Sequence, residues 1–234
     1  MINNKFDYKT VDRETIDGKR HYCLPDGSKV PSVTTILDRT KPEADKAALE
    51  NWRKAVGHAK AKQVTEEAAA RGTRMHNYLE NYVLTGSHKA VPRNPFAIPS
   101  HRMAQEVIDK GLCNMTAYWG VEVALYFSGL YAGTTDGVGE WKGIPAIFDY
   151  KQTNKPKTVD RVVDYKIQLA AYAAAHNNMF GTDIKHGIIM MCVKPDEKIV
   201  TSVPVYQEFV VEPEEFAFYT EQWWDRVDSY YKLN

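Results

Sequence analysis

The first thirty residues alternate hydrophobic and polar side chains around two turn-forming sequences. The turns are Asp17-Gly18 and Pro25-Asp26-Gly27-Ser28, and alternation around such turns is typical of β-hairpins. After Pro31 the apolar residues recur every three or four positions, among many alanines and glutamates, which is the spacing of helices. Helices are predicted to begin at residues 31–37, with Ser32 as N-cap, and to cover residues 43–57, 65–85 and 99–111.

Strands dominate the pattern between residues 114 and 152. The predicted strands are Val121–Tyr126, Gly129–Glu140 and Ile144–Lys151. Beyond them, the pattern predicts a helix over residues 160–178, a buried strand over Gly187–Val193, a strand near 199–211 and a helix that opens at Pro213. This order predicts an α/β fold in which a mixed β-sheet is flanked by helices, with a helical elaboration on its N-terminal side.

One domain is expected to span residues 1–234. The chain has no internal repeat or low-complexity tract, and residues 86–101, with three prolines, are predicted to form a long loop between two helices. Within the domain we expect an N-terminal hairpin and helical part over 1–113, a catalytic sheet with its crossover helix over 114–211, and a C-terminal helix over 212–234.

Charge and cysteine content exclude several classes of protein. Lysine plus arginine and aspartate plus glutamate number 30 each, which argues against a basic, non-specific nucleic-acid coat. The last 28 residues carry seven acids and two bases, so the rest has 28 bases against 23 acids, and a basic face is expected there. Three dispersed cysteines argue against disulfides and against an iron–sulfur cluster, and favour a reducing compartment.

The cellular setting is predicted from what the sequence lacks. No apolar run approaches the ~18 residues of a membrane span, and the start Met-Ile-Asn-Asn-Lys resembles neither a signal nor a transit peptide. We therefore expect no membrane partner and a cytoplasmic location, in a bacterial or phage-infected cell. The sequence indicates no oligomeric state.

Two carboxylates are predicted to face each other across a hairpin. If Lys142-Gly143 form its turn, opposed positions sum to 285, which pairs Asp136 with Asp149. Like charges at this spacing repel, and a hard divalent cation such as Mg²⁺ or Mn²⁺ would neutralise them. Lys151 points to the same face and can orient a water or balance charge on a phosphate.

Two helices offer further polar side chains, each of which alone has an ordinary structural explanation. Gly72, His76 and Glu80 recur every four residues on one helix face, where a histidine is more often a hydrogen-bonded core residue than a ligand. Gln168 and Tyr172 share a stripe of the helix over residues 160–178 in the same way. The tripeptide Asp-Tyr-Lys also occurs three times, so only its context at Asp149 selects one copy.

Taken in order, these elements resemble the PD-(D/E)xK nuclease superfamily, specifically its RecB-like branch. Four motifs carry the resemblance: Gly72-Thr73-Arg74-Met75-His76, Gly133-Thr134-Thr135-Asp136, Asp149-Tyr150-Lys151 and Gln168-Leu169-Ala170-Ala171-Tyr172. The segments Val30 to Leu37 and Asp149 to Lys157 are similar to those of the mitochondrial genome maintenance exonuclease group and its phage relatives. The resemblance implies a restriction-endonuclease-like core.

The resemblance also implies roles for individual residues. His76, Asp136, Asp149 and the carbonyl of Tyr150 would hold Mg²⁺ or Mn²⁺, and Lys151 would position the attacking water. The remaining predicted site residues are Gln168 and Tyr172, which would orient the lysine or contact the phosphate, and Glu80 as a supporting residue. Residues predicted to contact DNA are Ser32, Thr34, Arg53, Arg71, Arg74, Lys155, Lys157 and Arg161.

The sequence therefore predicts a metal-dependent exonuclease that acts on DNA and prefers single-stranded ends. One alternative is an endonuclease or double-strand-specific repair nuclease of the same superfamily. A second is a non-catalytic DNA-binding subunit that retains the fold, and a third is a protein with a buried acidic pair and no DNA function.

Overall fold

The computed structural model describes residues 2–3, 5–196, 198–199 and 201–233. Its largest sheet has the order β4-β5-β6-β7-β8, with β6 and β7 parallel and the other neighbours antiparallel. The five strands are β4 (Met115–Phe127), β5 (Tyr131–Trp141), β6 (Ile144–Thr153), β7 (Gly187–Val193) and β8 (Val205–Val211). The predicted α/β fold with a mixed, helix-flanked sheet is confirmed.

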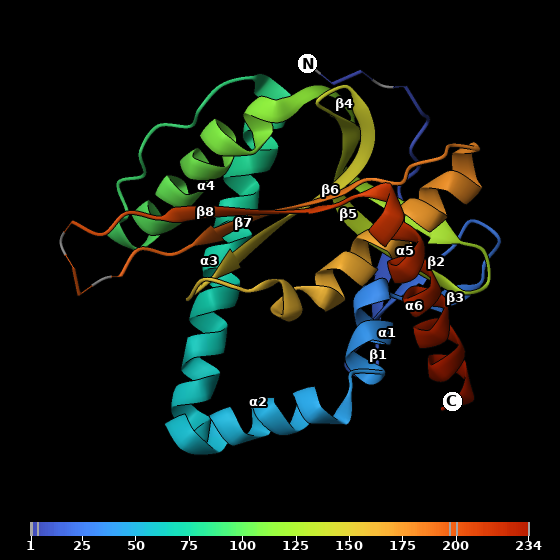
Figure 1. Ribbon diagram of the computed structural model, residues 1–234, viewed down its shortest axis with the longest axis horizontal. Helices are drawn as coiled ribbons and strands as arrows, with labels where there is room; N and C mark the ends of the chain where they lie inside the picture. The colour runs from blue at the N-terminus through green and yellow to red at the C-terminus, as the bar shows by residue number, and fades with distance from the viewer. Residues whose placement is uncertain (1, 4, 197, 200, 234) are drawn as a thin grey trace.

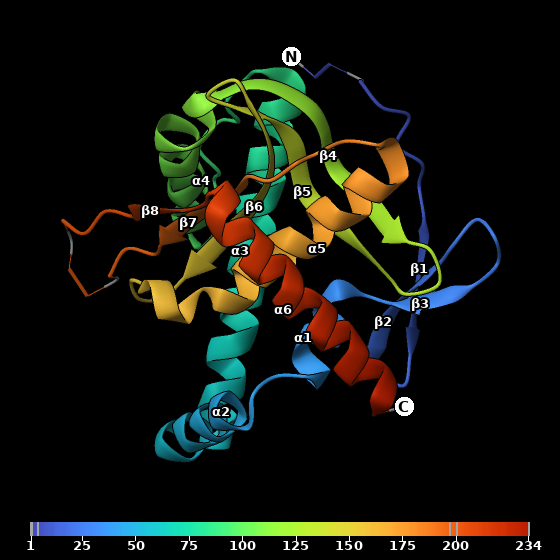
Figure 2. The ribbon, with the colours of Figure 1, turned by 45° about the vertical axis from the view of Figure 1, so that its right-hand side comes forward.

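Helices cover both faces of this sheet (Figures 1 and 2). One apolar cluster joins the sheet to α1, α5 and α6, and a second joins it to α3 and α4. Every residue of β7 is buried, which fits its continuous apolar sequence. The helices are α1 (Val33–Arg39), α2 (Glu43–Val56), α3 (His58–Thr85), α4 (Ile98–Lys110), α5 (Val163–Phe180) and α6 (Pro213–Lys232).

A small antiparallel sheet formed by the N-terminal hairpins leads into α1. Its strands are β1 (Asp12–Ile16), β2 (Lys19–Cys23) and β3 (Lys29–Pro31). The Tyr22 hydroxyl lies 3.1 Å from Thr134 Oγ1 of β5, and Ser32 forms a bridge to Ala132. The small sheet is thereby tied to the strand that carries Asp136.

Helix α2 lies apart from the sheet and crosses from α1 to α3 (Figure 1). None of its residues is buried. Gly57 separates it from α3 with φ 85° and ψ 137°, a conformation that only glycine adopts readily. The long helix α3 then runs back toward the sheet.

Some predicted boundaries differ from the structure. Helix α3 begins seven residues earlier than expected, because residues 58–64 are good helix formers although they are mostly polar. The strand predicted near 199–211 begins at Val205, and its start lies partly outside the described residues. The predicted helix over 160–178 is a short 3₁₀ turn, Val159–Arg161, followed by α5.

No helix in the part of the chain that the structure describes is long and apolar enough to span a membrane.

His176 of α5 is buried and held in a neutral form by its hydrogen bonds. Its Nδ1 lies 2.7 Å from Thr182 Oγ1, and that hydroxyl donates to Asn177 Oδ1. Because the Thr182 hydroxyl has one proton, His176 Nδ1–H must be the donor. Nε2 then accepts from the Tyr8 hydroxyl at 2.9 Å.

Acidification should therefore destabilise the protein through His176. Burial, followed by the charge of Lys5, lowers its pKa to about 4, against about 6.5 in the unfolded chain. Between these values the unfolded chain binds a proton that the folded chain does not, so stability is complete above about pH 6.5 and falls toward pH 4, by about 3 kcal/mol at most. Urea unfolding of His176→Gln, which cannot titrate, should show a shallower fall over this range than the wild type. Equal slopes would contradict the assignment.

Candidate active site

The β5–β6 hairpin places two aspartates at the point where these strands stop pairing. Lys142 and Gly143 form its turn, with φ of 51° and 82°, as expected for a two-residue hairpin. The predicted register holds from Trp141 opposite Ile144 to Gly137 opposite Phe148. Asp136 and Asp149 are the next positions on the two strands, and the Tyr150 N–H donates to Asp136 Oδ2 at 2.6 Å.

The glycine of the Gly-x-x-Asp motif leaves room for a side chain of α5. A Cβ at Gly133 would lie 2.5 Å from Cε1 of Tyr172 and 3.3 Å from Cγ2 of Val33. The contact with Tyr172 is too short for two carbon atoms, so any other residue here would displace Tyr172 or the strand. The glycine therefore allows α5 to pack close to the end of β5.

Helix α3 supplies His76. Met75, Leu79 and Val83 bury the face of α3 that packs on the sheet, and this orientation turns His76 toward β5. His76 Nδ1 lies 3.1 Å from Asp136 Oδ1, and its ring stands perpendicular to that of Tyr150, with centroids 5.7 Å apart. The structure thus brings the histidine and the first aspartate together, 60 residues apart in the chain.

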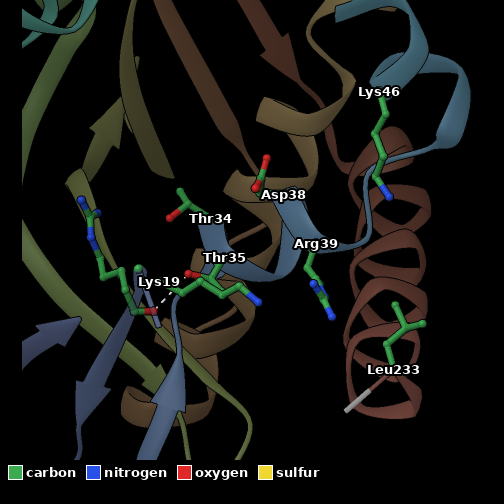
Figure 3. A pocket seen from close by; sticks show the side chains of 9 residues that line it. Lys19, Thr34, Thr35, Asp38, Arg39, Lys46 and Leu233 are labelled. Carbon is green, nitrogen blue, oxygen red and sulfur yellow. Dashed lines mark hydrogen bonds between the residues drawn. The ribbon is translucent and has the colours of Figure 1, made fainter. Parts of the chain in front are cut away.

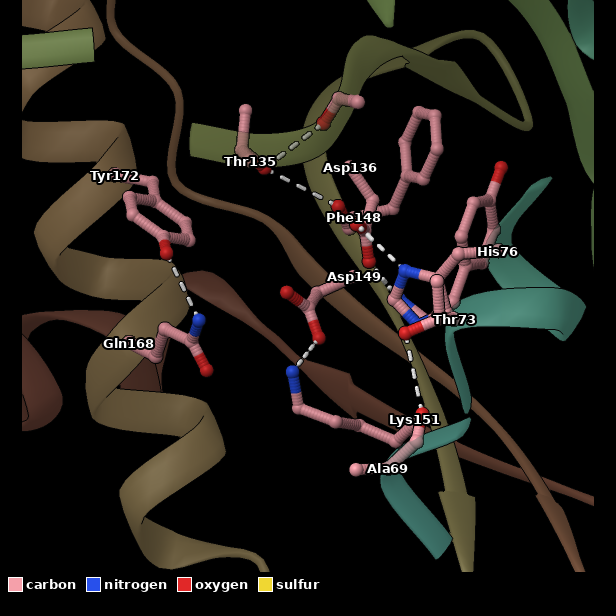
Figure 4. A network of polar contacts seen from close by, with 12 residues as sticks. Ala69, Thr73, His76, Thr135, Asp136, Phe148, Asp149, Lys151, Gln168 and Tyr172 are labelled. Atoms are coloured by element: carbon pink, nitrogen blue, oxygen red, sulfur yellow. Dashed lines mark hydrogen bonds and ion pairs between the residues drawn. The ribbon is translucent and has the colours of Figure 1, made fainter. Parts of the chain in front are cut away.

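Lys151 and Asp149 form an ion pair on the same strand (Figure 4). The side chains are 19% and 6% exposed, so water reaches the ammonium only partly. Lys151 Nζ also lies 4.9 Å from the centroid of the Tyr165 ring on α5. The lysine is consequently held between the Asp149 carboxylate and the Tyr165 ring.

The second helix motif lies on α5 and faces the same space. Gln168 Nε2 donates to the Tyr172 hydroxyl at 2.9 Å. Figure 4 shows both side chains pointing from α5 toward Asp149 and Lys151, while His76 and Asp136 lie on the opposite side. The four motifs therefore meet around one region in the middle of β5 and β6, where these two strands stop pairing with each other.

The two aspartates have opposite pKa shifts. Burial, followed by the negative charge of Asp136, raises the pKa of Asp149 to about 6, against the lowering effect of Lys151. Burial would also raise the pKa of Asp136, but the charge and hydrogen bond of His76 outweigh it and hold that pKa below its usual range. Their mutual repulsion is the residual strain that a bound cation would relieve.

The basic partners respond in the opposite sense. Burial lowers the pKa of Lys151 and of His76, yet the adjacent aspartates more than compensate and raise both values above the ordinary ones. Lys151 is therefore a cation at neutral pH. Its ammonium has three N–H donors, so it can donate to a water or a phosphate while it stays paired with Asp149.

Glu122 of β4 is a site residue that the sequence did not indicate. One ligand atom each of His76, Glu122 and Asp136 lies within 4.8 Å of the others. Glu122 has φ 50° in the middle of a strand, an uncommon conformation for a non-glycine residue. It is exposed, but partial loss of hydration, followed by the charge of Asp136, raises its pKa to about 7. The available signal was that Glu122 is the single charged residue between 115 and 127.

These donors fit a hard divalent cation. Two carboxylates and an imidazole lie within reach of one ion, and their unbalanced negative charge favours one. Asp149 is not part of that three-residue group, and its Oδ2 accepts from Lys151. Glu80 lies one turn beyond His76 on α3 and is half-buried, and its charge contributes to the raised pKa of Glu122.

Two predicted DNA contacts are engaged inside the protein. Ser32 is 2% exposed, and its Oγ accepts from the Thr35 N–H at 3.0 Å, so its side chain caps α1 as predicted. Arg71 is buried and donates to Gln152 Oε1 at 2.9 Å and to Asn154 Oδ1. Both side chains are engaged within the protein because α1 packs on β5 and α3 on β6, and their contact with DNA stays a prediction.

The other predicted DNA contacts lie on accessible segments. Arg74 is half-buried, with Nε 3.4 Å from Ser100 Oγ, and Arg53 is exposed on α2 beside Glu50. Thr34 is exposed, and Lys155, Lys157 and Arg161 follow β6. The Gln207 side chain of β8 makes two hydrogen bonds to the Lys157 backbone. The Lys157 N–H donates to Oε1 at 2.9 Å, and Nε2 donates to the Lys157 carbonyl at 3.0 Å.

The mixed sheet and the ordered motifs at its hairpin resemble those of the PD-(D/E)xK nuclease superfamily. Comparison with known proteins supports this resemblance, although no family model matches the chain. The chain is 28% identical over 175 residues to mitochondrial genome maintenance exonuclease 1 of Xenopus tropicalis and 25% identical over 209 residues to the human protein of that name. These alignments cover 70% and 86% of this chain.

The chain spans 49% of the frog relative's length and 58% of the human one's. Among solved structures it is similar to a putative exonuclease from Eubacterium rectale, with a TM-score of 0.47 and 14% identity. That similarity covers 70% of this chain and 64% of the other.

Proposed function

We propose that this chain is a metal-dependent exonuclease that hydrolyses DNA phosphodiester bonds from single-stranded ends. The observation that carries the proposal is the meeting of His76, Asp136, Asp149 and Lys151 where β5 and β6 stop pairing with each other. The curated relatives are named as exonucleases, in keeping with this chemistry.

His76, Asp136, Asp149 and the carbonyl of Tyr150 would hold Mg²⁺ or Mn²⁺, and Glu122 is placed to add a carboxylate. When bound, such an ion polarises the phosphate and lowers the pKa of its water. The Tyr150 N–H and His76 contact different oxygens of the Asp136 carboxylate. These two contacts fix the orientation of the carboxylate, as hydrogen bonds to metal ligands commonly do.

Lys151 has two roles in the proposed reaction. Its ammonium is charged and is positioned by Asp149 and the Tyr165 ring. It donates hydrogen bonds that orient the attacking water and balance charge that builds on the phosphate oxygens. Gln168 and Tyr172 point from α5 toward Asp149 and Lys151. Their amide and hydroxyl groups can hold the scissile phosphate or the lysine.

The preference for single strands rests on the surface of α2. Trp52 is 37% exposed, and Leu49 and Val56 are also exposed, with Arg53 and Lys54 in the last turn of the same helix. Unpaired bases stack on exposed aromatic rings at ~1–3 kcal/mol each, and nearby basic side chains contact the phosphates of the nucleic-acid backbone. A duplex hides its bases and gains less from such a surface.

The test compares substrates that differ only in their ends. With Mg²⁺ or Mn²⁺, end-labelled linear single strands and single-stranded tails should be degraded faster than blunt duplex, and closed single-stranded circles of the same sequence should stay intact. EDTA should stop degradation. Rapid cutting of closed circles would instead identify an endonuclease. Absence of metal-dependent cleavage on every substrate would leave a binding protein.

A further inference from the structure

A basic pocket lies beside α1, and none of the residues that line it belongs to the four motifs. It has a volume of about 570 Å³ and is bordered by the β1–β2 turn, α1 and the start of α2. Lys19, Arg20, Arg39 and Lys46 line it, with Asp38 as its one acid. Figure 3 shows Lys19, Arg39 and Lys46 reaching from three separate segments around α1.

The pocket's positive charge is not cancelled within the protein. In the described part of the chain Lys19, Arg20 and Arg39 form no ion pair, and Lys46 pairs only with Glu43, on its own helix, at 2.8 Å. With Lys46 paired, three further cations face one carboxylate, Asp38, which stands out in a chain of zero formal charge. This local excess of positive charge attracts a polyanion.

The walls of the pocket are fixed by hydrogen bonds. The Arg20 carbonyl accepts from the Ser32 N–H and from Thr35 Oγ1, both at 3.0 Å. These bonds lock β2 to the start of α1, and they leave the exposed Thr34 beside the cations. The cations therefore extend from a rigid base, which reduces the entropy lost when an anion binds.

The pocket is connected to the candidate active site through β5. Ser32 bridges Ala132, and the Tyr22 hydroxyl lies 3.1 Å from Thr134 Oγ1. From Ala132 to Asp136 the strand covers four residues, or about 13 Å at ~3.3 Å each. The bridge partner Ser32 lies two residues before the pocket residue Thr34. A DNA strand held in the pocket would therefore reach the aspartates within a few nucleotides.

We propose that this pocket binds the phosphodiester backbone of a DNA single strand, a few nucleotides away from the bond being cut. The inference rests on the proposed function, because it assigns the pocket to the same substrate. Cations from three segments, spread over an open pocket, suit successive phosphates better than one small anion. Thr34 adds a hydroxyl donor to the same backbone.

Binding of labelled oligothymidylate in EDTA, where no cleavage occurs, tests this proposal. The variant Lys19→Ala/Arg20→Ala/Arg39→Ala should bind a strand of about 20 nucleotides at least ten-fold more weakly than the wild type. Its salt slope should fall by about 2, since each lost phosphate contact removes ~0.7. Binding of the shortest oligonucleotide that the wild type cleaves should change little.

The matched control is Lys89→Ala/Lys110→Ala/Lys185→Ala, which removes three exposed lysines from other parts of the surface. Circular dichroism confirms that each variant is folded. Equal affinities of the pocket variant and the wild type for the long strand would overturn the proposal, as would an equal loss in the control. Competition by inorganic phosphate as strong as that of the strand, per phosphate, would also overturn it. If the pocket variant loses binding but the wild type cleaves nothing with Mg²⁺ or Mn²⁺, the pocket stands and the proposed hydrolysis falls.

Discussion

Replacing Lys151 by alanine should lower the rate of single-strand cleavage about a hundred- to a thousand-fold, with metal binding preserved. The lysine is a charged donor held over Asp149, and loss of one such donor to a developing charge typically costs this much. Single-turnover cleavage measures the rate, and Mn²⁺ titration calorimetry measures metal affinity. The control is Lys185→Ala, which removes an exposed lysine outside the predicted site and the predicted DNA contacts.

A Lys151→Ala protein that cleaves at the wild-type rate would exclude the lysine from the reaction. A protein that has lost both cleavage and Mn²⁺ affinity would show that Lys151 holds the site together instead. Binding of single strands in EDTA should be nearly unchanged, because one partly buried cation contributes little to a long interface.

Asp136→Asn should reduce cleavage on the order of a thousand-fold or more and weaken Mn²⁺ binding at the same time. Asp136 is the carboxylate that contacts both His76 and the Tyr150 N–H, so its charge is central to any cation site there. The asparagine retains the shape, and the fold should survive. Asp160→Asn, a change at an exposed acid, serves as control and should leave both quantities unaltered.

If Asp136→Asn retains its Mn²⁺ affinity, the cation is held by Asp149 and the Tyr150 carbonyl without Asp136. Retained cleavage would remove Asp136 from the mechanism.

The central hairpin could be predicted because its information is local. Turn residues Lys142 and Gly143 determine the register, and alternation along β5 and β6 determines the faces. His76 and Gln168 were found by a different route, since their spacing alone is equally typical of core residues. Only the order of four motifs selected them, and the structure shows them around the same space.

Glu122 and Arg71 show where such prediction ends. Glu122 reaches the site because β4 pairs with β5 and because its backbone has a positive φ, and neither fact is encoded in a local pattern. The burial of Arg71 depends on Gln152 and Asn154, about 80 positions away, so no local pattern predicts it. Its contact with DNA stays a prediction.

Helix α2 divides the molecule into parts of unequal local stability. It buries none of its residues and is joined to α3 through Gly57, whereas β7 is wholly buried. Free energies of local opening follow buried contacts, so amide protons of α2 should exchange with solvent through small fluctuations, while those of β7 wait for global unfolding. The peptide bonds around Gly57 are correspondingly the natural place for a protease to cut first. A nicked chain would keep its sheet and its cluster of aspartates, histidine and lysine, and would lose only the covalent continuity between its first and third helices.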